Sequence, residues 1–279
     1  MGDLPRLSFR DPLELGRRPA LFLDFDGTLV PISSRPSDVH LSEEHARLLG
    51  LLAGTCPTFV ISGRGEADLL ARLPAVALAG VSADHGAVRI LAGERHLHPE
   101  AERAREGLPD LSVRVREEME AIPGVLVEGK EFSLSIHYRL MAPEQIGEAR
   151  ERLERILAES VGREGGSGLR ISEGKKVWEI RPARGVTKEE SLDFFLDWLS
   201  AGAMGSDAYF PVMAGDDTTD LAAVNRARAR GGIGIWVGSP PPGLDPGATV
   251  LASPEELWAA LRTLLPDPLP ASPGRGGRL

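Results

Sequence analysis

Short apolar runs that end abruptly in polar residues recur along the N-terminal third of the chain. They indicate strands buried on both faces, as in a parallel sheet. The segments between them place apolar residues at helical spacing, and Pro74 ends one of these helices. Because the two patterns alternate, we expect a parallel sheet covered by helices on both faces. The predicted strands are residues 20–30, 58–61, 76–79 and 87–91, and the predicted helices are residues 40–52 and 66–73.

The pattern changes near residue 97, where charged amphipathic helices and alternating strands replace the buried runs. Along residues 132–138, apolar side chains alternate with Ser133, Ser135 and His137, which predicts an antiparallel sheet with one face toward water. We therefore expect residues 97–178 to form an inserted α+β cap. Its predicted helices are residues 99–107, 112–122 and 143–160, and its predicted strands are residues 125–128, 133–138, 169–172 and 177–180.

Buried strands and helices alternate again after the insert. We assign residues 1–96 and 179–265 to one α/β core, a doubly wound parallel sheet. Residues 266–279 are rich in Pro, Gly and Ser and are predicted to be a disordered tail. The predicted strands of this part are residues 209–214 and 232–237, and its helices are residues 188–199, 221–228 and 254–265.

The composition is that of an ordinary globular protein, with 42% hydrophobic and 26% charged residues among 279. A net charge of −9 and an aromatic content of 5% argue against a nucleic-acid partner. No apolar run reaches the length of a membrane span, and no N-terminal segment has the pattern of a signal peptide. Cys56 is the only cysteine, which excludes disulfides within the chain. We expect a cytoplasmic protein without nucleic-acid or membrane partners; a monomer is compatible with the sequence, which leaves the oligomeric state open.

Two carboxylates end the first apolar run, in the segment DFDGT at residues 24–28. Residues i and i+2 of a strand point to the same side, so Asp24 and Asp26 converge at the strand's end. Burying two like charges together is costly unless a cation lies near them. A divalent metal is the usual cation, and a carboxylate beside a metal can act as a nucleophile. A surface turn with N-capping Asp residues is the alternative.

A second acidic group, GDDTTD at residues 215–220, follows the apolar strand at residues 209–214. Ligands of an open parallel sheet bind beyond the carboxyl ends of its strands, so the two acidic groups can meet there. Asp24, Asp216 and a backbone carbonyl suit Mg²⁺, which prefers oxygen ligands and keeps several waters. Asp217 and Asp220 can bind the metal directly, bind it through water, or pair with a lysine.

Ser62 and Lys188 are candidates for binding an anion at the same edge. Ser62 follows the strand at residues 58–61, where a hydroxyl and free N–H groups can hold an anion. Lys188 opens a helix, and its charge would neutralise a phosphoryl group. Taken singly, Ser62 is better explained as a helix N-cap, and Lys188 equally well as a solvated lysine.

Together, DFDGT, the Ser62 of ISGR, Lys188 and GDDTTD resemble the motifs of the haloacid dehalogenase superfamily of phosphotransferases. They occur in the same order and span most of the chain. The resemblance implies that Asp24 attacks phosphorus and forms an aspartyl-phosphate. It also implies that Asp26 protonates the leaving oxygen and then activates water, which requires Asp26 to hold a proton at neutral pH.

The remaining roles that the resemblance implies concern phosphate and metal. Thr28 would shape the loop and help to bind the phosphate, together with Ser62 and Lys188. The implied magnesium site is drawn from Asp24, the Phe25 carbonyl, Asp26, Asp216, Asp217 and Asp220.

Further segments are similar to the trehalose 6-phosphate phosphatase family. They are DFDGTLVPI at residues 24–32, ADHG at residues 83–86 and EGKKVWEIRP at residues 173–182. The insert lies where the superfamily has a large α+β cap, typical of sugar-phosphate phosphatases. The resemblance implies hydrolysis of trehalose 6-phosphate to trehalose and phosphate. Asp84 stands where that family usually has Glu.

A disaccharide offers many hydroxyl groups, which charged side chains of the cap would bind. Lys175 and Glu179 are four residues apart on one strand and therefore face the same side, and His85 lies on the core edge that faces the cap. Glu173 and Arg139 complete the expected sugar-binding set. An ion pair between Lys175 and Glu179 is the alternative.

Three other functions remain open. A cap-bearing phosphatase of the mannosyl-phosphoglycerate or sucrose-phosphate type would need a different set of cap residues. A non-catalytic regulatory domain that binds a sugar phosphate would not require intact Asp24, Asp26 and Lys188. A phosphomutase shares the aspartyl-phosphate but depends on a bisphosphate activator.

Overall fold

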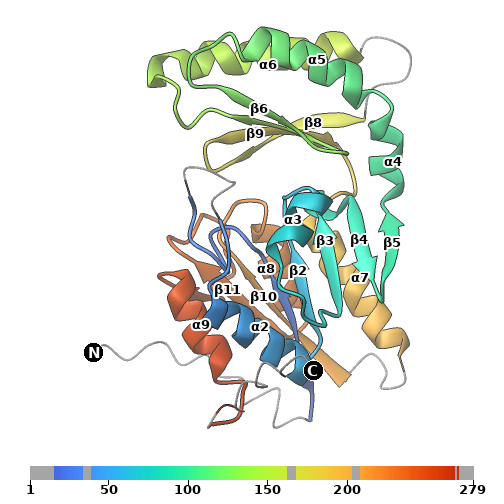
Figure 1. Ribbon diagram of the computed structural model, residues 1–279, viewed down its shortest axis with the longest axis vertical. Helices are drawn as coiled ribbons and strands as arrows, with labels where there is room; N and C mark the ends of the chain where they lie inside the picture. Colours follow the sequence, from blue (N-terminus) through green and yellow to red (C-terminus); the bar gives the residue numbers. More distant parts are fainter. Residues whose placement is uncertain (1–15, 34–38, 162–167, 203–207, 268, 270–279) are drawn as a thin grey trace, which may run out of the picture.

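The computed structural model describes residues 16–33, 39–161, 168–202, 208–267 and 269. It has two parts, which lie one above the other in Figure 1: an eight-stranded sheet with helices on both faces, and a four-stranded sheet covered by helices. This arrangement confirms the predicted α/β class. The predicted disordered tail at residues 266–279 lies almost entirely outside the described residues.

The large sheet brings the first strand of the chain to its centre. The strand order is β12-β11-β10-β1-β2-β3-β4-β5, with parallel pairing from β12 to β3 and antiparallel pairing of β3 with β4 and of β4 with β5. Leu23 at the end of β1 lies beside Ala214 of β10, so the two acidic segments leave the sheet at neighbouring points. The strands are β1 (Arg18–Leu23), β2 (Thr58–Ile61), β3 (Gly80–Ala83), β4 (Val88–Leu91), β5 (Glu94–Leu97), β10 (Tyr209–Gly215), β11 (Ile233–Val237) and β12 (Thr249–Leu251).

Helices cover both faces because the central strands are apolar on both sides. Leu21 and Leu23 of β1 pack into one hydrophobic cluster, with α2 (Glu43–Thr55), α3 (Glu66–Arg72) and α9 (Pro254–Arg262). Ala20 and Phe22 pack into the other, with α7 (Lys188–Ala201) and α8 (Leu221–Ala229). The predicted doubly wound core is therefore confirmed.

The small sheet is antiparallel, with strand order β6-β7-β9-β8. Trp178, Ile136 and Ile180 pack from the sheet against α5 and α6. The helix α4 (Pro99–Arg105) lies at one side between the two parts (Figure 1). The other elements are α5 (Leu108–Met119), α6 (Ile146–Val161), β6 (Leu126–Gly129), β7 (Leu134–His137), β8 (Leu169–Gly174) and β9 (Val177–Pro182).

Several predicted elements differ from the structure. The predicted strand at residues 76–79 is wrong: the N–H groups of Val76 and Leu78 form local turn bonds, and Gly80–Ala83 pairs with β2 instead. A Cβ at Gly80 would lie 2.9 Å from the Ile90 carbonyl, so this strand position requires glycine. The strands β5 and β12 were not predicted, and β1 ends at Leu23, which leaves residues 24–30 as a loop.

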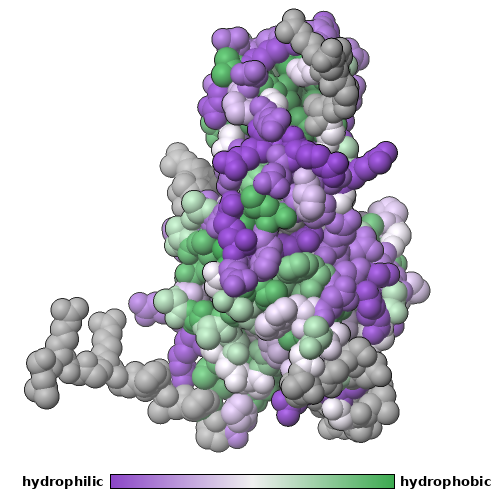
Figure 2. Space-filling model, turned by 90° about the vertical axis from the view of Figure 1, so that its right-hand side faces the viewer, coloured by the Kyte–Doolittle hydropathy of each residue, from purple (hydrophilic) through white to green (hydrophobic). Residues whose placement is uncertain are grey.

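The junction of the two parts also differs from expectation. The strand β9 runs to Pro182 within the small sheet, beyond the expected limit at residue 178. Ser133 and Ser135 are buried, although alternation predicted a wet face, because the core covers that side of the small sheet. Hydrophilic side chains gather around the junction on the face shown in Figure 2. Among the described residues, no helix is long and apolar enough to cross a membrane.

Candidate active site

The loop after β1 places Asp24 directly beyond the centre of the large sheet. The Asp24 N–H donates to the Ala214 carbonyl at 3.0 Å, and the Asp24 side chain is buried. The indole of Trp258 donates to the Leu29 carbonyl at 2.9 Å and fixes the far end of the loop. Gly27 has a φ of +84°, and a Cβ there would collide with Asp216. The glycine of DFDGT therefore permits the two acidic segments to approach each other.

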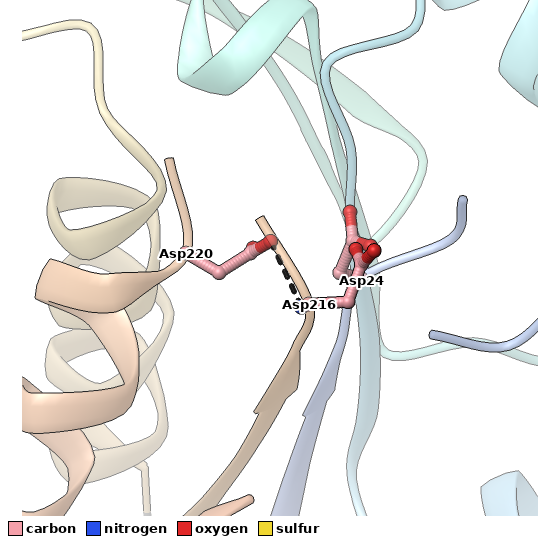
Figure 3. A group of neighbouring side chains, drawn as sticks. All are labelled: Asp24, Asp216 and Asp220. Atoms are coloured by element: carbon pink, nitrogen blue, oxygen red, sulfur yellow. Dashed lines mark hydrogen bonds between the residues drawn. The ribbon is translucent and has the colours of Figure 1, made fainter. Parts of the chain in front are cut away.

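Three buried carboxylates meet at this point. One oxygen each of Asp24, Asp216 and Asp220 lies within 4.8 Å of the others. Figure 3 shows Asp24 and Asp216 side by side at the ends of their strands, with Asp220 directed toward them from the start of α8. The predicted convergence of DFDGT and GDDTTD is thus present in the structure. Thr28 is buried beside the group, with its hydroxyl 3.5 Å from an Asp216 oxygen.

Lys188 joins this group from the first turn of α7. Its ammonium donates to Asp24 Oδ1 at 2.7 Å and to Asp220 Oδ1 at 2.6 Å, and its side chain is 4% exposed. Thr187 caps the helix by accepting the Glu190 N–H. The other oxygen of Asp220 accepts the N–H groups of Asp216 and Asp217. Asp220 therefore holds both the lysine and the acidic loop in place.

The ionisation of the group follows from burial and charge. Burial, then the charge of Asp220, raises the pKa of Asp24 to about 7, although Lys188 opposes the shift. Burial, then Asp24, likewise raises the pKa of Asp216 to about 7. For Lys188, burial alone would lower the pKa, but Asp220 and Asp24 outweigh it and raise the pKa. Lys188 alone does not neutralise three carboxylates, so the group favours additional positive charge.

The donor set fits Mg²⁺. Asp24 Oδ2 is buried and has no hydrogen-bond partner in the described part of the chain, which leaves it available as a ligand. Asp216 supplies a second carboxylate, and oxygen donors are those that magnesium prefers. The Phe25 carbonyl does not fit the prediction, because it accepts the N–H groups of Leu29 and Val30. Asp217 accepts the N–H groups of Lys175 and Thr218 and lies outside the group of three.

Asp26 also lies outside that group and pairs with an arginine. Arg64 donates through Nε and Nη2 to the two oxygens of Asp26, each at 2.6 Å. Both oxygens of Asp26 are therefore engaged by Arg64, whereas the expected first step requires one of them to face the leaving oxygen.

Ser62 lies at the end of β2 and is buried. Its hydroxyl accepts the Arg64 N–H at 3.2 Å, and its carbonyl accepts the His85 N–H at 2.9 Å. Both Ser62 and Lys188 line a cavity of about 250 Å³ between the large sheet and the cap. An anion in this cavity would meet a hydroxyl, an ammonium and the free oxygen of Asp24.

The cap side of the cavity is also lined with charged residues. Lys175, at the turn between β8 and β9, contacts the Asp216 carboxylate with its ammonium. Arg139 lines the cavity and donates to the Ser33 carbonyl of the core at 2.7 Å. Glu173 does not line it: its side chain is 67% exposed and pairs with Arg150 at 3.7 Å. The structure thus brings Lys175 and Arg139 to the cavity and leaves Glu173 outside.

His85 and Glu179 are buried side by side, with Nε2 and Oε2 2.6 Å apart. Lys130 donates to Glu179 Oε1 at 3.4 Å and to the Gly63 carbonyl at 2.7 Å, which links the cap to the loop after β2. Burial alone would raise the pKa of Glu179, but His85 and Lys130 hold it well below its usual range. Burial lowers the pKa of His85. Both residues line the cavity, a position from which they could contact a sugar. That contact stays a prediction.

The charged cavity residues that were not among the sequence candidates include Arg64, Glu128 and Lys130. Arg64 is the last residue of the ISGR motif, and its position at a strand end could have identified it. Lys130 is one of only four lysines and lies in the predicted turn between two cap strands. Glu128 pairs with His137 at 3.1 Å, a contact across two strands that the local pattern does not reveal.

Residues 22–243 match the family model described as trehalose-phosphatase. The chain belongs to the trehalose-phosphatase family. The match spans Asp24, Ser62, Lys188 and Asp216, and it includes the whole cap.

Two relatives and one solved structure are similar to this chain over most of its length. An uncharacterized glycosyl hydrolase of Mycobacterium tuberculosis is 36% identical over 80% of this chain and 16% of that protein. A trehalose-phosphate phosphatase of Mycolicibacterium paratuberculosis is 35% identical over 76% of this chain and 52% of that protein. This chain therefore spans about half the length of that phosphatase and a smaller share of the other relative.

The C-terminal domain of a trehalose-6-phosphate phosphatase from Candida albicans has the same fold, with a TM-score of 0.73. The match covers 91% of this chain and 93% of that domain at 23% sequence identity. At this identity, the likeness shows the fold of this trehalose-phosphatase family member and not its substrate.

Proposed function

We propose that this chain is a magnesium-dependent phosphatase that hydrolyses trehalose 6-phosphate to trehalose and phosphate. The observation that carries the proposal is the meeting of Asp24, Asp216 and Lys188 in one buried group beneath a charged cap. Membership of the trehalose-phosphatase family supports the sugar. Phosphatase chemistry rests on the buried group, and the substrate rests on the family.

Asp24 would attack the phosphorus through one oxygen of its carboxylate, and the other oxygen would contact the metal. Lys188 holds Oδ1 and so orients the carboxylate, while its charge favours the negative phosphoryl group. The attack forms the aspartyl-phosphate and breaks the bond to the sugar oxygen, which takes a proton from Asp26. In the second displacement, Asp26 takes a proton from the water that attacks this phosphorus, and phosphate and free Asp24 result.

Asp24 and Asp216 would hold the magnesium ion, with Asp220 in support. When bound, the ion supplies positive charge that keeps the two carboxylates ionised and stabilises charge on the phosphoryl oxygens. Ser62 and Thr28 would donate hydrogen bonds to the phosphoryl group. Asp217 is better placed to fix the cap hairpin, since it accepts the Lys175 N–H at 3.2 Å.

The cap would recognise the sugar. We assign this role to Lys175 and Arg139 and to the His85–Glu179 pair, with Lys130 and Glu128 added from the structure. We also propose that the cap is a domain of its own, ending near Pro182 where β9 ends. A cytoplasmic location is part of the proposal, and the single free, buried Cys56 agrees with it.

Phosphate release from a panel of sugar phosphates tests this function. With magnesium present, trehalose 6-phosphate is expected to be the preferred substrate over sucrose 6-phosphate, mannosyl-phosphoglycerate and glucose 6-phosphate. Asp24→Asn is expected to lose roughly 10⁴-fold or more in kcat, whereas the exposed Asp197→Asn keeps full activity. Preference for another sugar phosphate would contradict the substrate. Absence of all hydrolysis would favour the regulatory-domain alternative, and dependence on a bisphosphate activator would favour the phosphomutase.

A further inference from the structure

We propose that Arg64 is a positioning residue for Asp26. This inference rests on the phosphatase chemistry proposed above, but not on the identity of the sugar. The guanidinium forms two parallel hydrogen bonds with the carboxylate, from Nε to Oδ2 and from Nη2 to Oδ1, both at 2.6 Å. Two short parallel contacts fix the plane of the carboxylate as well as its position. The Asp26 side chain is 37% exposed, so Arg64 supplies an orientation that burial does not.

Arg64 is itself held from three sides. Its side chain is 9% exposed and lies over the ring of Phe25, with Cζ 5.6 Å from the ring centre. Its third nitrogen, Nη1, donates to Asp68 Oδ2 of α3 at 2.6 Å. Arg72 in turn donates to Asp68 and, through Nη1, to the Val39 carbonyl at 2.7 Å. The guanidinium is therefore a rigid support, because α3 and a phenyl ring fix it before any substrate is present.

The backbone of Arg64 belongs to the loop that carries Ser62. Its N–H donates to the Ser62 hydroxyl at 3.2 Å, and its carbonyl accepts the Asp84 N–H at 2.7 Å. One residue thus fixes the distance between the expected phosphate-binding hydroxyl and the expected proton donor. A proton donor that is misplaced by about 1 Å can lose 10²-fold in rate.

Proton transfer to the sugar oxygen requires one oxygen of Asp26 to break its hydrogen bond with Arg64 and face the ester. The other oxygen can remain on Arg64, which keeps the carboxyl group beside the phosphorus. When the proton has moved to the sugar oxygen, Asp26 is a carboxylate again and can resume both contacts seen here. Arg64 therefore acts through Asp26 and does not itself exchange a proton.

Aryl phosphates that differ only in their leaving group test this role without a sugar. The measurement is kcat/KM across a series from phenyl to dinitrophenyl phosphate, because a poor leaving group needs the proton and a good one does not. Arg64→Gln is expected to lose roughly 10²-fold on phenyl phosphate and less than about tenfold on dinitrophenyl phosphate. Asp26→Asn is expected to show the same steepened dependence on the leaving group. The double variant is expected to lose no more than Asp26→Asn alone, since the two residues act as one unit.

Arg226→Gln is the matched control, because Arg226 also forms a two-contact pair with an aspartate, Asp193, at 3.1 and 3.0 Å. It is expected to leave the leaving-group dependence unchanged. Arg64→Lys keeps the charge but loses the two parallel hydrogen bonds, and we expect it to show the same steepened dependence on the leaving group. It replaces Arg64→Gln should that variant fail to fold.

Equal losses on all esters would overturn the proposal and indicate that Arg64 binds the phosphate directly. Unchanged rates, or additive losses in the double variant, would also overturn it. A wild-type chain that hydrolyses no phosphate ester would overturn the proposed function together with this role. An active wild type with an unaltered leaving-group dependence in Arg64→Gln would overturn only the role of Arg64.

Discussion

The ammonium of Lys175 contacts the carboxylate of Asp216, which joins the tip of the β8–β9 hairpin of the cap to the end of β10 in the core. Asp216 is 3% exposed on its side chain, and Lys175 is 45% exposed. The lysine thus supplies from the cap a positive charge that the three buried carboxylates lack. A magnesium ion on Asp216 would compete with this contact, and its binding would release the lysine toward the cavity.

Substitution of Lys175 is therefore expected to strengthen magnesium binding in the absence of substrate. Lys175→Met removes the competing charge, and we expect the Kd for magnesium to fall by roughly three- to tenfold, about 1 kcal/mol. Isothermal titration calorimetry on the substrate-free protein measures this directly. Lys176→Met is the control, since Lys176 is the exposed neighbour in the same turn. An unchanged or weaker affinity in Lys175→Met would show that the contact does not oppose the metal.

The same lysine is expected to distinguish sugar esters from simple ones. Lys175→Ala should lower kcat/KM for trehalose 6-phosphate by roughly tenfold or more, because it removes a charged hydrogen-bond donor from the cap side of the cavity. The rate on an aryl phosphate should change far less, since that substrate has no sugar hydroxyls. Parallel phosphate-release assays on both esters measure the difference, and equal losses would contradict a sugar-binding cap.

Removal of divalent metal is expected to change how stability depends on pH. The pKa of Asp216 is raised from 3.8 to about 7, chiefly by burial and by Asp24. The folded protein therefore keeps a proton that the unfolded chain releases, so this contribution to stability is present at low pH. It is lost as the pH rises through about 7, by an amount on the order of a few kcal/mol.

Unfolding by urea in the presence of a chelator, at a series of pH values, measures this dependence. The Asp216→Asn variant should show a smaller fall in the free energy of unfolding between acid and neutral pH. Added magnesium should stabilise the wild type by about 2.7 kcal/mol at 100 times its Kd, and Asp216→Asn much less. Asp197→Asn, an exposed substitution on α7, should follow the wild type. Parallel pH curves for all three proteins would refute the raised pKa.

Loss of the Glu179 charge is expected to destabilise the junction of cap and core. Glu179→Gln leaves Lys130 buried with a weaker partner and removes the carboxylate charge beside His85. We expect a loss of about 3–5 kcal/mol in the free energy of unfolding, as for other broken buried pairs. Urea unfolding measures it, with the exposed Glu173→Gln as control. A loss no larger than in that control would mean that the buried pair does not stabilise the junction.

The sequence by itself determined the fold class, most of the elements and the chemistry of the two acidic segments. Continuous apolar runs specify strands buried on both faces, and this local property located β1, β2 and β10 in advance. Parallel strands end at one edge of a sheet, so the pattern predicted that Asp24 and Asp216 can meet there, and the structure brings them together. The strand at Gly80–Ala83 was misplaced because its position depends on close packing against Phe59 and Phe195, which no local pattern expresses.

Only the tertiary structure decided how the charged side chains pair. Asp26 pairs with Arg64, whereas Asp24 pairs with Lys188, although the two aspartates are two residues apart on the same loop. The Phe25 carbonyl is used within that loop, and Glu173 lies outside the cavity that Lys175 lines. These outcomes depend on the placement of the cap over the sheet and on contacts between residues far apart in the chain. Charge pairing is a long-range property, whereas the spacing of apolar residues is a local one, and this difference separates what the sequence predicts from what the folded structure determines.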